Sequence, residues 1–223
     1  MPAPELRGRV DAPGGPVSTL WIDPGAPAPV LALAHGAGAG MEHPFLAGFC
    51  RGLEARGVAT FRFNFPYVEA GRRSPDREPV LRATWLAAFE AAVGLAGGRP
   101  VLAGGKSLGG RIASMCAADG MPASGLVFLG YPLHPPGAPE RLRAEHLRRV
   151  LVPMLFLHGT RDPFARPDLL AAVLEGLGAR AEYVRIEGGD HSFNVRGRKV
   201  DAREVGAGLA ELAAPFVLRV AGR

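Results

Sequence analysis

Short apolar runs alternate with longer amphipathic stretches along most of the chain. The short runs have the length and the flanking glycines and prolines of buried strands, whereas the longer stretches repeat apolar residues at helical spacing. The predicted strands are residues 5–10, 17–22, 30–34, 58–63, 100–103, 125–129, 153–157 and 181–186. The predicted helices are residues 45–56, 80–95, 108–118, 139–150, 167–177 and 200–218.

The order of these elements predicts an α/β fold. Strands that alternate with helices at this spacing form a doubly wound, mostly parallel sheet with helices on both faces. The first two strands are separated by a turn rich in proline and glycine, residues 12–16, which is typical of an antiparallel hairpin. The sequence contains no internal repeat and no linker, so residues 1–223 are expected to form one domain.

A serine flanked by glycines follows the fifth predicted strand. The segment Gly105-Lys106-Ser107-Leu108-Gly109 matches the G-x-S-x-G nucleophile elbow, a sharp turn that lifts the serine hydroxyl above the ends of the strands. In a chain with 31 glycines these five residues alone are weak evidence, but a strand precedes them and a helix follows. This context predicts that Ser107 is a nucleophile at a helix N-terminus, where an anion is stabilised.

The same residues also resemble the end of a nucleotide-binding P-loop. That motif, G-x-x-x-x-G-K-[ST], requires glycine at position 100, where this chain has Pro100. It also requires a loop before the lysine, whereas residues 101–103 are typical of a strand. The nucleophile elbow is therefore the preferred interpretation.

A serine nucleophile needs a histidine base that is oriented by a carboxylate. In folds built around a nucleophile elbow, these residues follow the serine in the order Asp or Glu, then His. Asp162 lies just beyond the strand 153–157, and His191 lies between the last strand and the last helix. Asp190 is the rival acid, but it directly precedes His191 and is poorly placed to orient that ring. Ser107, Asp162 and His191 are the predicted catalytic residues.

The segment His35-Gly36-Ala37-Gly38 follows the third predicted strand and matches the oxyanion loop of this fold. We expect the backbone N–H groups of Ala37 and Leu108 to bind the oxyanion, with Gly38 as the alternative to Ala37. Five apolar residues of the neighbouring loops could either line a substrate cleft or pack in the core. These residues are Met41, Tyr67, Leu133, Phe164 and Phe193.

Charge and composition narrow the class of protein. The net charge is +5, yet the basic residues are scattered and form no run that would indicate nucleic-acid binding. No apolar run approaches the roughly 20 residues that span a bilayer, and the N-terminus lacks the apolar core of a signal peptide. We therefore expect a soluble, cytoplasmic protein without a membrane or nucleic-acid partner. Arg72 and Arg73 could attract an acidic substrate, although a solvated loop is the preferred interpretation.

The two cysteines, Cys50 and Cys116, lie in predicted helices and are interpreted as small buried residues. No spacing of cysteines and histidines in the sequence resembles a zinc site, so no metal is expected. The sequence therefore indicates a fold that is stabilised by its apolar core.

Several motifs together resemble the α/β-hydrolase superfamily over nearly the whole chain. They are most similar to the compact, capless dienelactone-hydrolase-like group. Within that group they resemble a lineage of bacterial hypothetical hydrolases that includes the hydrolase-like domain of a eukaryotic chromatin-complex subunit. The motifs are His35–Gly38, Gly104–Arg111, Gly130–Gly137, Leu157–Asp162 and Gly188–Phe193. The resemblance implies acyl transfer through a covalent acyl-enzyme, without a cofactor and without a large cap domain.

One departure from dienelactone hydrolase concerns the nucleophile, which is expected to be cysteine in that enzyme and is Ser107 here. The expected function is therefore hydrolysis of small carboxylic esters, with short to medium acyl chains, by a monomer or a homodimer. A thioesterase or a lactone hydrolase is the alternative within the same chemistry. A catalytically silent binding or scaffold module is the alternative outside it.

Overall fold

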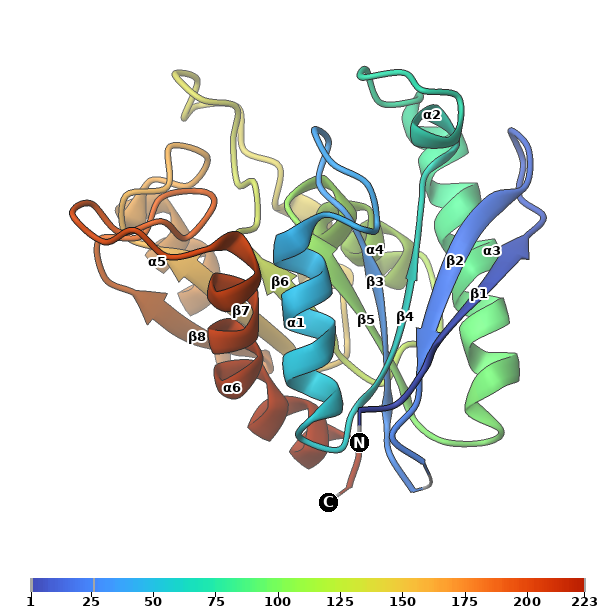
Figure 1. Cartoon of the computed structure of the whole chain (residues 1–223). Helices are drawn as coiled ribbons and strands as arrows, with labels where there is room; N and C mark the ends of the chain where they lie inside the picture. Colours follow the sequence, from blue (N-terminus) through green and yellow to red (C-terminus); the bar gives the residue numbers. More distant parts are fainter. Residues whose placement is uncertain (1, 26, 223) are drawn as a thin grey trace.

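Eight strands form one sheet in the computed structural model of the chain, which describes residues 2–25 and 27–222. The strands lie side by side in the order β1-β2-β4-β3-β5-β6-β7-β8 (Figure 1). Pairing is parallel from β4 to β8 and antiparallel at β1 and β2. The strands are β1 (Glu5–Val10), β2 (Val17–Ile22), β3 (Val30–Ala34), β4 (Ala59–Phe63), β5 (Val101–Lys106), β6 (Leu126–Leu129), β7 (Met154–Gly159) and β8 (Ala181–Ile186).

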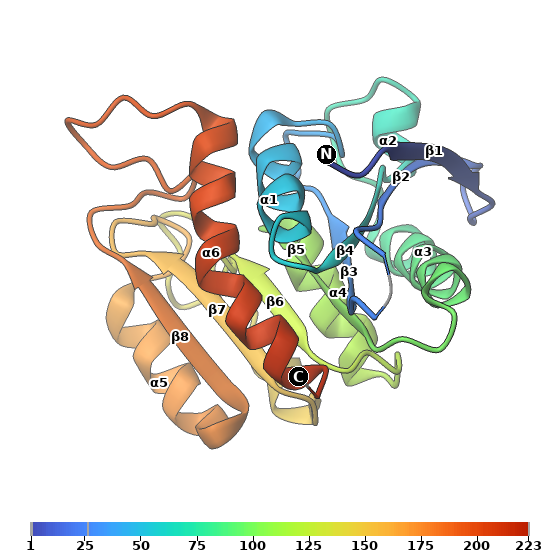
Figure 2. The same cartoon turned by 60° about the horizontal axis from the view of Figure 1, so that its bottom comes forward.

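Helices cover both faces of the sheet, with α1 and α6 on one face and α3, α4 and α5 on the other (Figures 1 and 2). The helices are α1 (Pro44–Glu54), α2 (Pro66–Glu69), α3 (Glu78–Ala96), α4 (Leu108–Ala118), α5 (Pro167–Leu177) and α6 (Ala202–Val220), with two 3₁₀ helices, η1 (Glu145–Arg149) and η2 (Gly178–Arg180). The predicted doubly wound α/β fold is confirmed, and the described residues include no large cap domain.

The central strand β3 explains the continuous apolar runs of the sequence. Val30, Ala32 and Ala34 belong to the core beneath α3, α4 and α5, whereas Leu31 and Leu33 belong to the core beneath α1 and α6. Because both faces of the strand bury side chains, polar residues have no place in it. Each fully buried leucine contributes roughly 1.5–3 kcal/mol to the stability of the fold.

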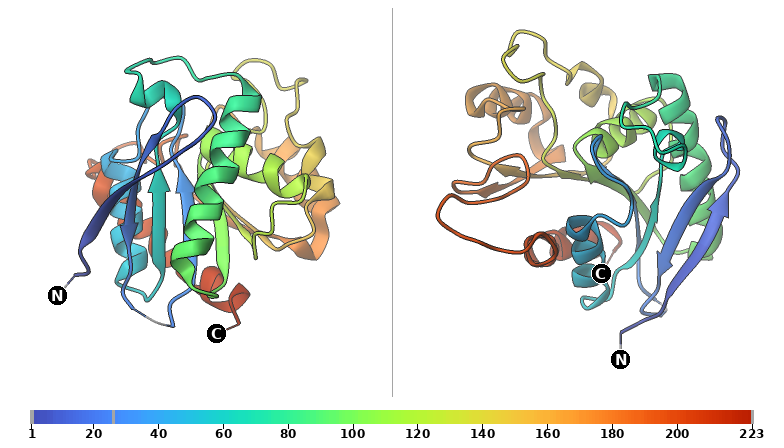
Figure 3. Two further views of the ribbon diagram at one scale, coloured as in Figure 1. Left: turned by 90° about the vertical axis from the view of Figure 1, so that its right-hand side faces the viewer. Right: turned by 45° about the horizontal axis from the view of Figure 1, so that its top comes forward.

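The carboxyl ends of the parallel strands meet at one edge of the sheet, at the top of Figure 1 and nearer the viewer in the right panel of Figure 3. β3 lies between β4 and β5, so the chain leaves β3 in one direction and leaves β5 in the other. Such a reversal opens a crevice at the strand ends, where α/β sheets bind ligands. The loops after β3, β5, β7 and β8 border this crevice.

The helix predicted over residues 139–150 is wrong, because only η1 forms there. The Arg143 N–H donates to the Leu133 carbonyl at 2.8 Å, and the Arg143 carbonyl accepts from Tyr131 Oη at 2.8 Å. These long-range bonds engage backbone groups that a helix would need. His146 is consequently half-buried and lies 2.8 Å from Ser114 Oγ, not on a solvated helix.

Helix α3 is more apolar than the sequence analysis anticipates. It is the one helix in the described part of the chain that is long and apolar enough, by length and composition alone, to cross a membrane. Its residues Leu81, Trp85 and Phe89 are buried in the core against the sheet. A core helix passes the same test, so we interpret α3 as a core helix.

Cys50 and Cys116 are free and buried, as predicted.

Helices α1 and α6 touch through their backbones. A Cβ atom on Gly48 of α1 would lie 2.0 Å from the Arg203 carbonyl oxygen, and one on Gly206 of α6 would lie 2.0 Å from the Phe45 carbonyl oxygen. Glycine is therefore required at both positions of this crossing. The contact fixes the N-terminal end of α1, and with it the loop that leads from β3 into the crevice.

Replacement of Gly206 by alanine is expected to lower the free energy of unfolding by at least 1–3 kcal/mol, because the helices must separate to admit the methyl group. Gly208 is the matched control on the same helix, since a Cβ atom there would meet nothing within 4 Å. Gly208→Ala should stabilise the protein by up to about 1 kcal/mol through helix propensity. Urea denaturation of both variants measures the difference, and equal effects would contradict the close helix contact.

Candidate active site

Ser107 occupies the turn between β5, which ends at Lys106, and α4, which begins at Leu108. Its φ of 50° and ψ of −113° form a backbone conformation that residues with side chains rarely adopt. The Ser107 N–H donates to the Leu129 carbonyl at the end of β6, at 3.1 Å, and anchors the turn to the sheet. Ser107 lines the crevice at the strand ends.

Two glycines make this turn sterically possible. A Cβ atom on Gly105 would lie 2.3 Å from the Ala34 carbonyl oxygen, and a Cβ atom on Gly109 would lie 2.3 Å from the same oxygen. The Gly109 carbonyl in turn accepts from Trp85 Nε1 at 2.9 Å. The flanking glycines of the sequence motif are therefore required by close backbone contact.

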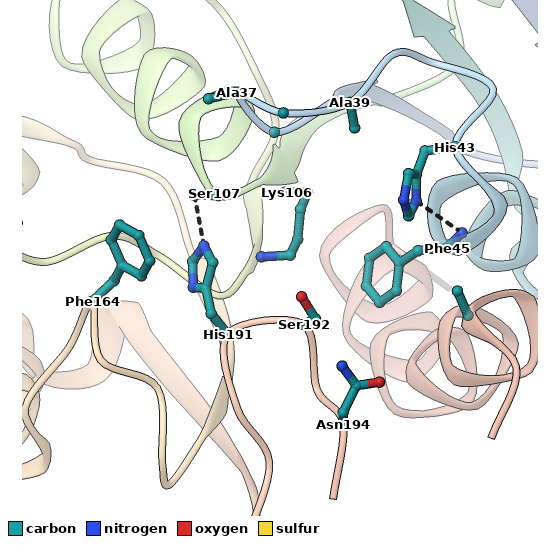
Figure 4. A pocket seen from close by; sticks show the side chains of 13 residues that line it. Ala37, Ala39, His43, Phe45, Lys106, Ser107, Phe164, His191, Ser192 and Asn194 are labelled. Carbon is teal, nitrogen blue, oxygen red and sulfur yellow. Dashed lines mark hydrogen bonds between the residues drawn. The ribbon is translucent and has the colours of Figure 1, made fainter. Parts of the chain in front are cut away.

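A continuous chain of hydrogen bonds joins Ser107, His191 and Asp162. His191 Nε2 lies 2.9 Å from Ser107 Oγ (Figure 4), and His191 Nδ1 lies 2.7 Å from Asp162 Oδ2. The three residues come from the ends of β5, β7 and β8. Because the carboxylate accepts the Nδ1 proton, Nε2 is left to accept the proton of the serine hydroxyl.

Asp162 is buried with both carboxylate oxygens engaged. Oδ1 accepts from the Phe164 N–H at 2.8 Å, and Oδ2 faces His158 Nε2 at 3.2 Å as well as His191. Burial alone would raise the pKa of Asp162, but the hydrogen bond from His191, the two histidines and the Phe164 N–H hold that pKa below its ordinary value. Asp162 therefore stays ionised and orients the His191 ring.

Asp190, the alternative acid, accepts hydrogen bonds from the backbone of its own loop. Its Oδ1 accepts from the backbone N–H groups of Ser192 at 2.8 Å and Asn194 at 2.9 Å. These bonds shape the turn that follows β8 and carries His191. The structure thus brings Asp162 to the His191 ring and leaves Asp190 as the cap of the turn.

Hydrogen bonds from side chains hold two carbonyl groups of the loop that follows β3. The Gly36 carbonyl lies 2.8 Å from His35 Nδ1, and the Ala37 carbonyl accepts from Tyr67 Oη at 3.0 Å. His35 Nε2 accepts from the Phe65 N–H at 3.1 Å, which leaves the proton on Nδ1 for the bond to Gly36. The backbone of this loop is therefore held rigidly beside Ser107.

The N–H groups predicted to bind an oxyanion have no hydrogen-bond acceptor in the part of the chain that the structure describes. Within residues 2–25 and 27–222, the N–H groups of Ala37 and Leu108 donate neither to a backbone nor to a side-chain acceptor. The same holds there for the alternative donor, Gly38. Ala37 and Gly38 both line the crevice with Ser107, so the structure keeps both alternatives for the second donor open.

A cavity of about 490 Å³ lies in front of Ser107 (Figure 4). Its lining is largely apolar, with a few polar side chains near the serine. The lining residues are Gly36, Ala37, Gly38, Ala39, His43, Phe45, Lys106, Ser107, Phe164, His191, Ser192, Asn194 and Ala202. This volume suits a small molecule.

Of the five predicted cleft residues, Phe164 alone lines this cavity, where its ring packs 4.2 Å from that of His191. Met41, Tyr67, Leu133 and Phe193 are buried in the core, so their assignment to the cleft is wrong. Tyr67 turns its hydroxyl to the oxyanion loop, and Phe193 lies behind the cavity wall, stacked on Phe45 at 5.8 Å.

Several residues that border the cavity are not among the predicted site residues, chiefly His43, Phe45, Lys106 and Asn194. Lys106 is a variable position of the G-x-S-x-G motif and directly precedes Ser107. His43 and Phe45 flank the start of α1, directly downstream of the oxyanion loop. Proximity in sequence to the predicted site was the available signal for each of these residues.

The fold, the strained serine turn and the crevice at the strand ends define an α/β hydrolase. A family model described as an alpha/beta hydrolase domain matches residues 27–216, and the chain belongs to this family. The match covers most of the sheet together with the loops that carry Ser107, Asp162 and His191.

Solved structures of similar fold include several hydrolases. A dienelactone hydrolase from Anabaena variabilis is 20% identical, with a TM-score of 0.78, and the match covers 98% of this chain and 99% of that one. An α/β serine hydrolase without a lid from Xanthomonas campestris is 20% identical, with a TM-score of 0.74 and coverage of 98% and 95%. Est1E from Butyrivibrio proteoclasticus, solved with ferulic acid, is 16% identical, with a TM-score of 0.77 and coverage of 97% and 100%. At these identities the likeness shows the fold.

The buried histidines predict how stability depends on pH. Burial lowers the pKa of His35 and of His158 to about 4 from an ordinary value of 6.5. Between pH 4 and 6.5 these two histidines bind protons in the unfolded chain but stay neutral in the folded chain. The free energy of unfolding is therefore highest above pH 6.5 and falls as the pH drops toward 4. Each histidine contributes up to about 1.4 kcal/mol per pH unit.

Urea denaturation at several pH values between 5 and 7 measures this slope. His35→Gln, which cannot bind a proton there, should reduce the slope. An identical slope for the wild type and His35→Gln would contradict a neutral, buried His35.

Proposed function

We propose that this chain is a serine hydrolase that cleaves small carboxylic esters, with Ser107 as nucleophile, His191 as base and Asp162 as orienting carboxylate. The observation that carries the proposal is the hydrogen-bonded chain from Asp162 through His191 to a serine in a strained turn. Nucleophilic catalysis by serine requires this combination of base, orienter and exposed hydroxyl.

In the first half of the reaction, His191 Nε2 takes the Ser107 proton as Oγ attacks the ester carbonyl carbon. The carbonyl oxygen becomes an oxyanion that accepts from the N–H groups of Leu108 and of Ala37 or Gly38. Each such donor contributes about 3 kcal/mol to transition-state stabilisation. Asp162 stabilises the imidazolium without taking its proton.

Collapse of the tetrahedral intermediate breaks the ester C–O bond, and His191 donates its proton to the departing alkoxide. The acyl group is then bonded to Ser107 Oγ. A water molecule, deprotonated by His191, attacks this acyl-enzyme through a second oxyanion. Release of the carboxylic acid returns the proton to Ser107 and restores the starting state.

The cavity limits the size of the substrate. Phe45 and Phe164 supply apolar walls close to Ser107, and the described residues carry no large cap that would enclose a long chain. We therefore propose esters with short to medium acyl groups. Thioesters and lactones pass through the same tetrahedral intermediate and stay within this chemistry. The serine hydrolase without a lid from Xanthomonas campestris, among the structural neighbours, supports the same class.

A fluorophosphonate probe tests whether Ser107 is a nucleophile. We expect covalent labelling of the purified wild-type protein, because the hydroxyl of a serine activated by histidine displaces fluoride from the probe and becomes phosphonylated. We expect no labelling of Ser107→Ala. Circular dichroism confirms that both proteins are folded. A folded wild-type protein that stays unlabelled would overturn the proposal and favour a binding module.

The rate of labelling also distinguishes the two acids, since Asp162→Asn removes the orienting charge. That variant should react roughly 10³–10⁴-fold more slowly than the wild type. Asp190→Asn is the matched control, because the amide oxygen can still accept from the N–H groups of its turn. Equal losses in both variants would contradict the assignment of Asp162.

A further inference from the structure

The ammonium group of Lys106 is buried at the wall of the cavity in front of Ser107 (Figure 4). Within the described residues, Lys106 Nζ has no hydrogen-bond partner. It lies against Gly130, where a Cβ atom would come within 3.2 Å of it, and 5.7 Å from the centre of the Phe193 ring. A cation that is buried without a hydrogen-bond partner carries a large desolvation penalty.

The nearby carboxylates do not neutralise this cation. Asp162 Oδ1 and Oδ2 are engaged by the Phe164 N–H and by His191, and Asp190 caps its own turn. Neither acid forms an ion pair with Lys106 among the residues that the structure describes. Burial lowers the pKa of Lys106 to about 8, although the charges of Asp162 and Asp190 oppose this shift. Lys106 therefore remains largely protonated at neutral pH and lacks an acceptor.

The choice of lysine at this position is informative in this chain. Of 26 basic residues, two are lysines, Lys106 and Lys199, and the rest are arginines. The ammonium is a compact charge on a flexible stem, and it binds a single anionic group with donors that can rotate. The stem of Lys106 packs on Gly36, where a Cβ atom would lie 3.5 Å from Cγ. This packing directs the ammonium along the cavity beside His191 (Figure 4).

We propose that Lys106 determines specificity by binding a carboxylate carried by the substrate, so that the preferred esters are small monoanions. The inference rests on the proposed function, because the same cavity must hold the ester. Lys106 is the single lysine or arginine that lines the cavity in the described residues, and one cation matches one carboxylate. A phosphate would retain uncompensated charge. Arg72, considered above for an acidic substrate, pairs with Asp76 and lies outside the cavity lining.

Matched ester pairs test this assignment. For a carboxylate on the acyl side, the pair is 4-nitrophenyl butyrate and the mono-4-nitrophenyl ester of succinic acid. For a carboxylate on the alcohol side, the pair is phenyl acetate and 4-acetoxybenzoate. We expect the wild type to have the higher kcat/KM for the anionic member of one pair. That pair shows whether the recognised carboxylate lies on the acyl side or the alcohol side of the ester. Rates measured with Ser107→Ala are subtracted, because the succinate ester also hydrolyses spontaneously.

Two substitutions separate charge from shape. Lys106→Met removes the cation from a stem of similar length and should lower the anionic-to-neutral ratio of kcat/KM about tenfold to a hundredfold, the value of a hydrogen bond to a charged group. Lys106→Arg keeps the charge and should retain part of the preference. The ratio is used because a merely structural role of Lys106 would reduce both members of a pair together.

The outcomes are distinguishable from failure of the proposed function. A wild type that reacts with the fluorophosphonate probe but prefers the neutral ester in both pairs overturns the role of Lys106 and leaves the hydrolase intact. This result needs no variant, so it holds even if Lys106→Met does not fold. A preference for the anionic ester that persists in a folded Lys106→Met variant also overturns the role of Lys106. A wild type that fails to react with the probe overturns the proposed function itself.

Discussion

The contact between three stretches of backbone at the centre of the sheet determines where every part of the site can lie. The Ala34 carbonyl at the end of β3 touches both Gly105 and Gly109, so β3, β5 and the start of α4 approach more closely than side chains would allow. This contact forces the chain through Ser107 into a left-handed conformation with a φ of 50°. The residue after Ala34 begins the oxyanion loop. One steric constraint therefore sets the relative positions of the proposed nucleophile, Ser107, and of the proposed oxyanion donors.

Much of the fold could be predicted because buried strands and amphipathic helices have distinct patterns. The hairpin strands, α4, α5 and β8 have the bounds that the sequence predicts. The order Ser107, Asp162, His191 could also be predicted, since each follows a strand and parallel strands end at one edge of the sheet. The helix over 139–150 could not be rejected from local pattern, because the Arg143 backbone is engaged by Leu133 and Tyr131 from the preceding loop.

The cleft residues could not be predicted for a related reason. An aromatic residue in a loop after a strand has the same pattern whether its ring faces the cavity or the core. Tyr67 is buried because its hydroxyl reaches the Ala37 carbonyl, and Phe193 is buried because its φ of 65° turns its ring onto Phe45. Both outcomes depend on tertiary contacts. The orientation of Lys106 depends on Gly36 and Gly130, which lie far from it in sequence.

The charges of the site are distributed in a way that suits acyl transfer. The buried histidines His35 and His158 are neutral at pH 7, since burial lowers the pKa of each to about 4. Asp162, the one buried acidic residue in the described part of the chain, is directed at His191. Among the described residues this leaves the Lys106 ammonium as the charge at the cavity wall without a partner. As lined by the described residues, the cavity therefore combines apolar walls with the Lys106 cation beside Ser107.

The most direct test of the account is to trap the acyl-enzyme. Rapid mixing with excess 4-nitrophenyl acetate should give a burst of 4-nitrophenolate close to one equivalent of protein if deacylation is the slower step. Acid quenching followed by intact-mass and peptide analysis should find one acetyl group on the peptide that contains Ser107. An acetyl group on another residue, or turnover of the ester that persists in Ser107→Ala, would contradict the account.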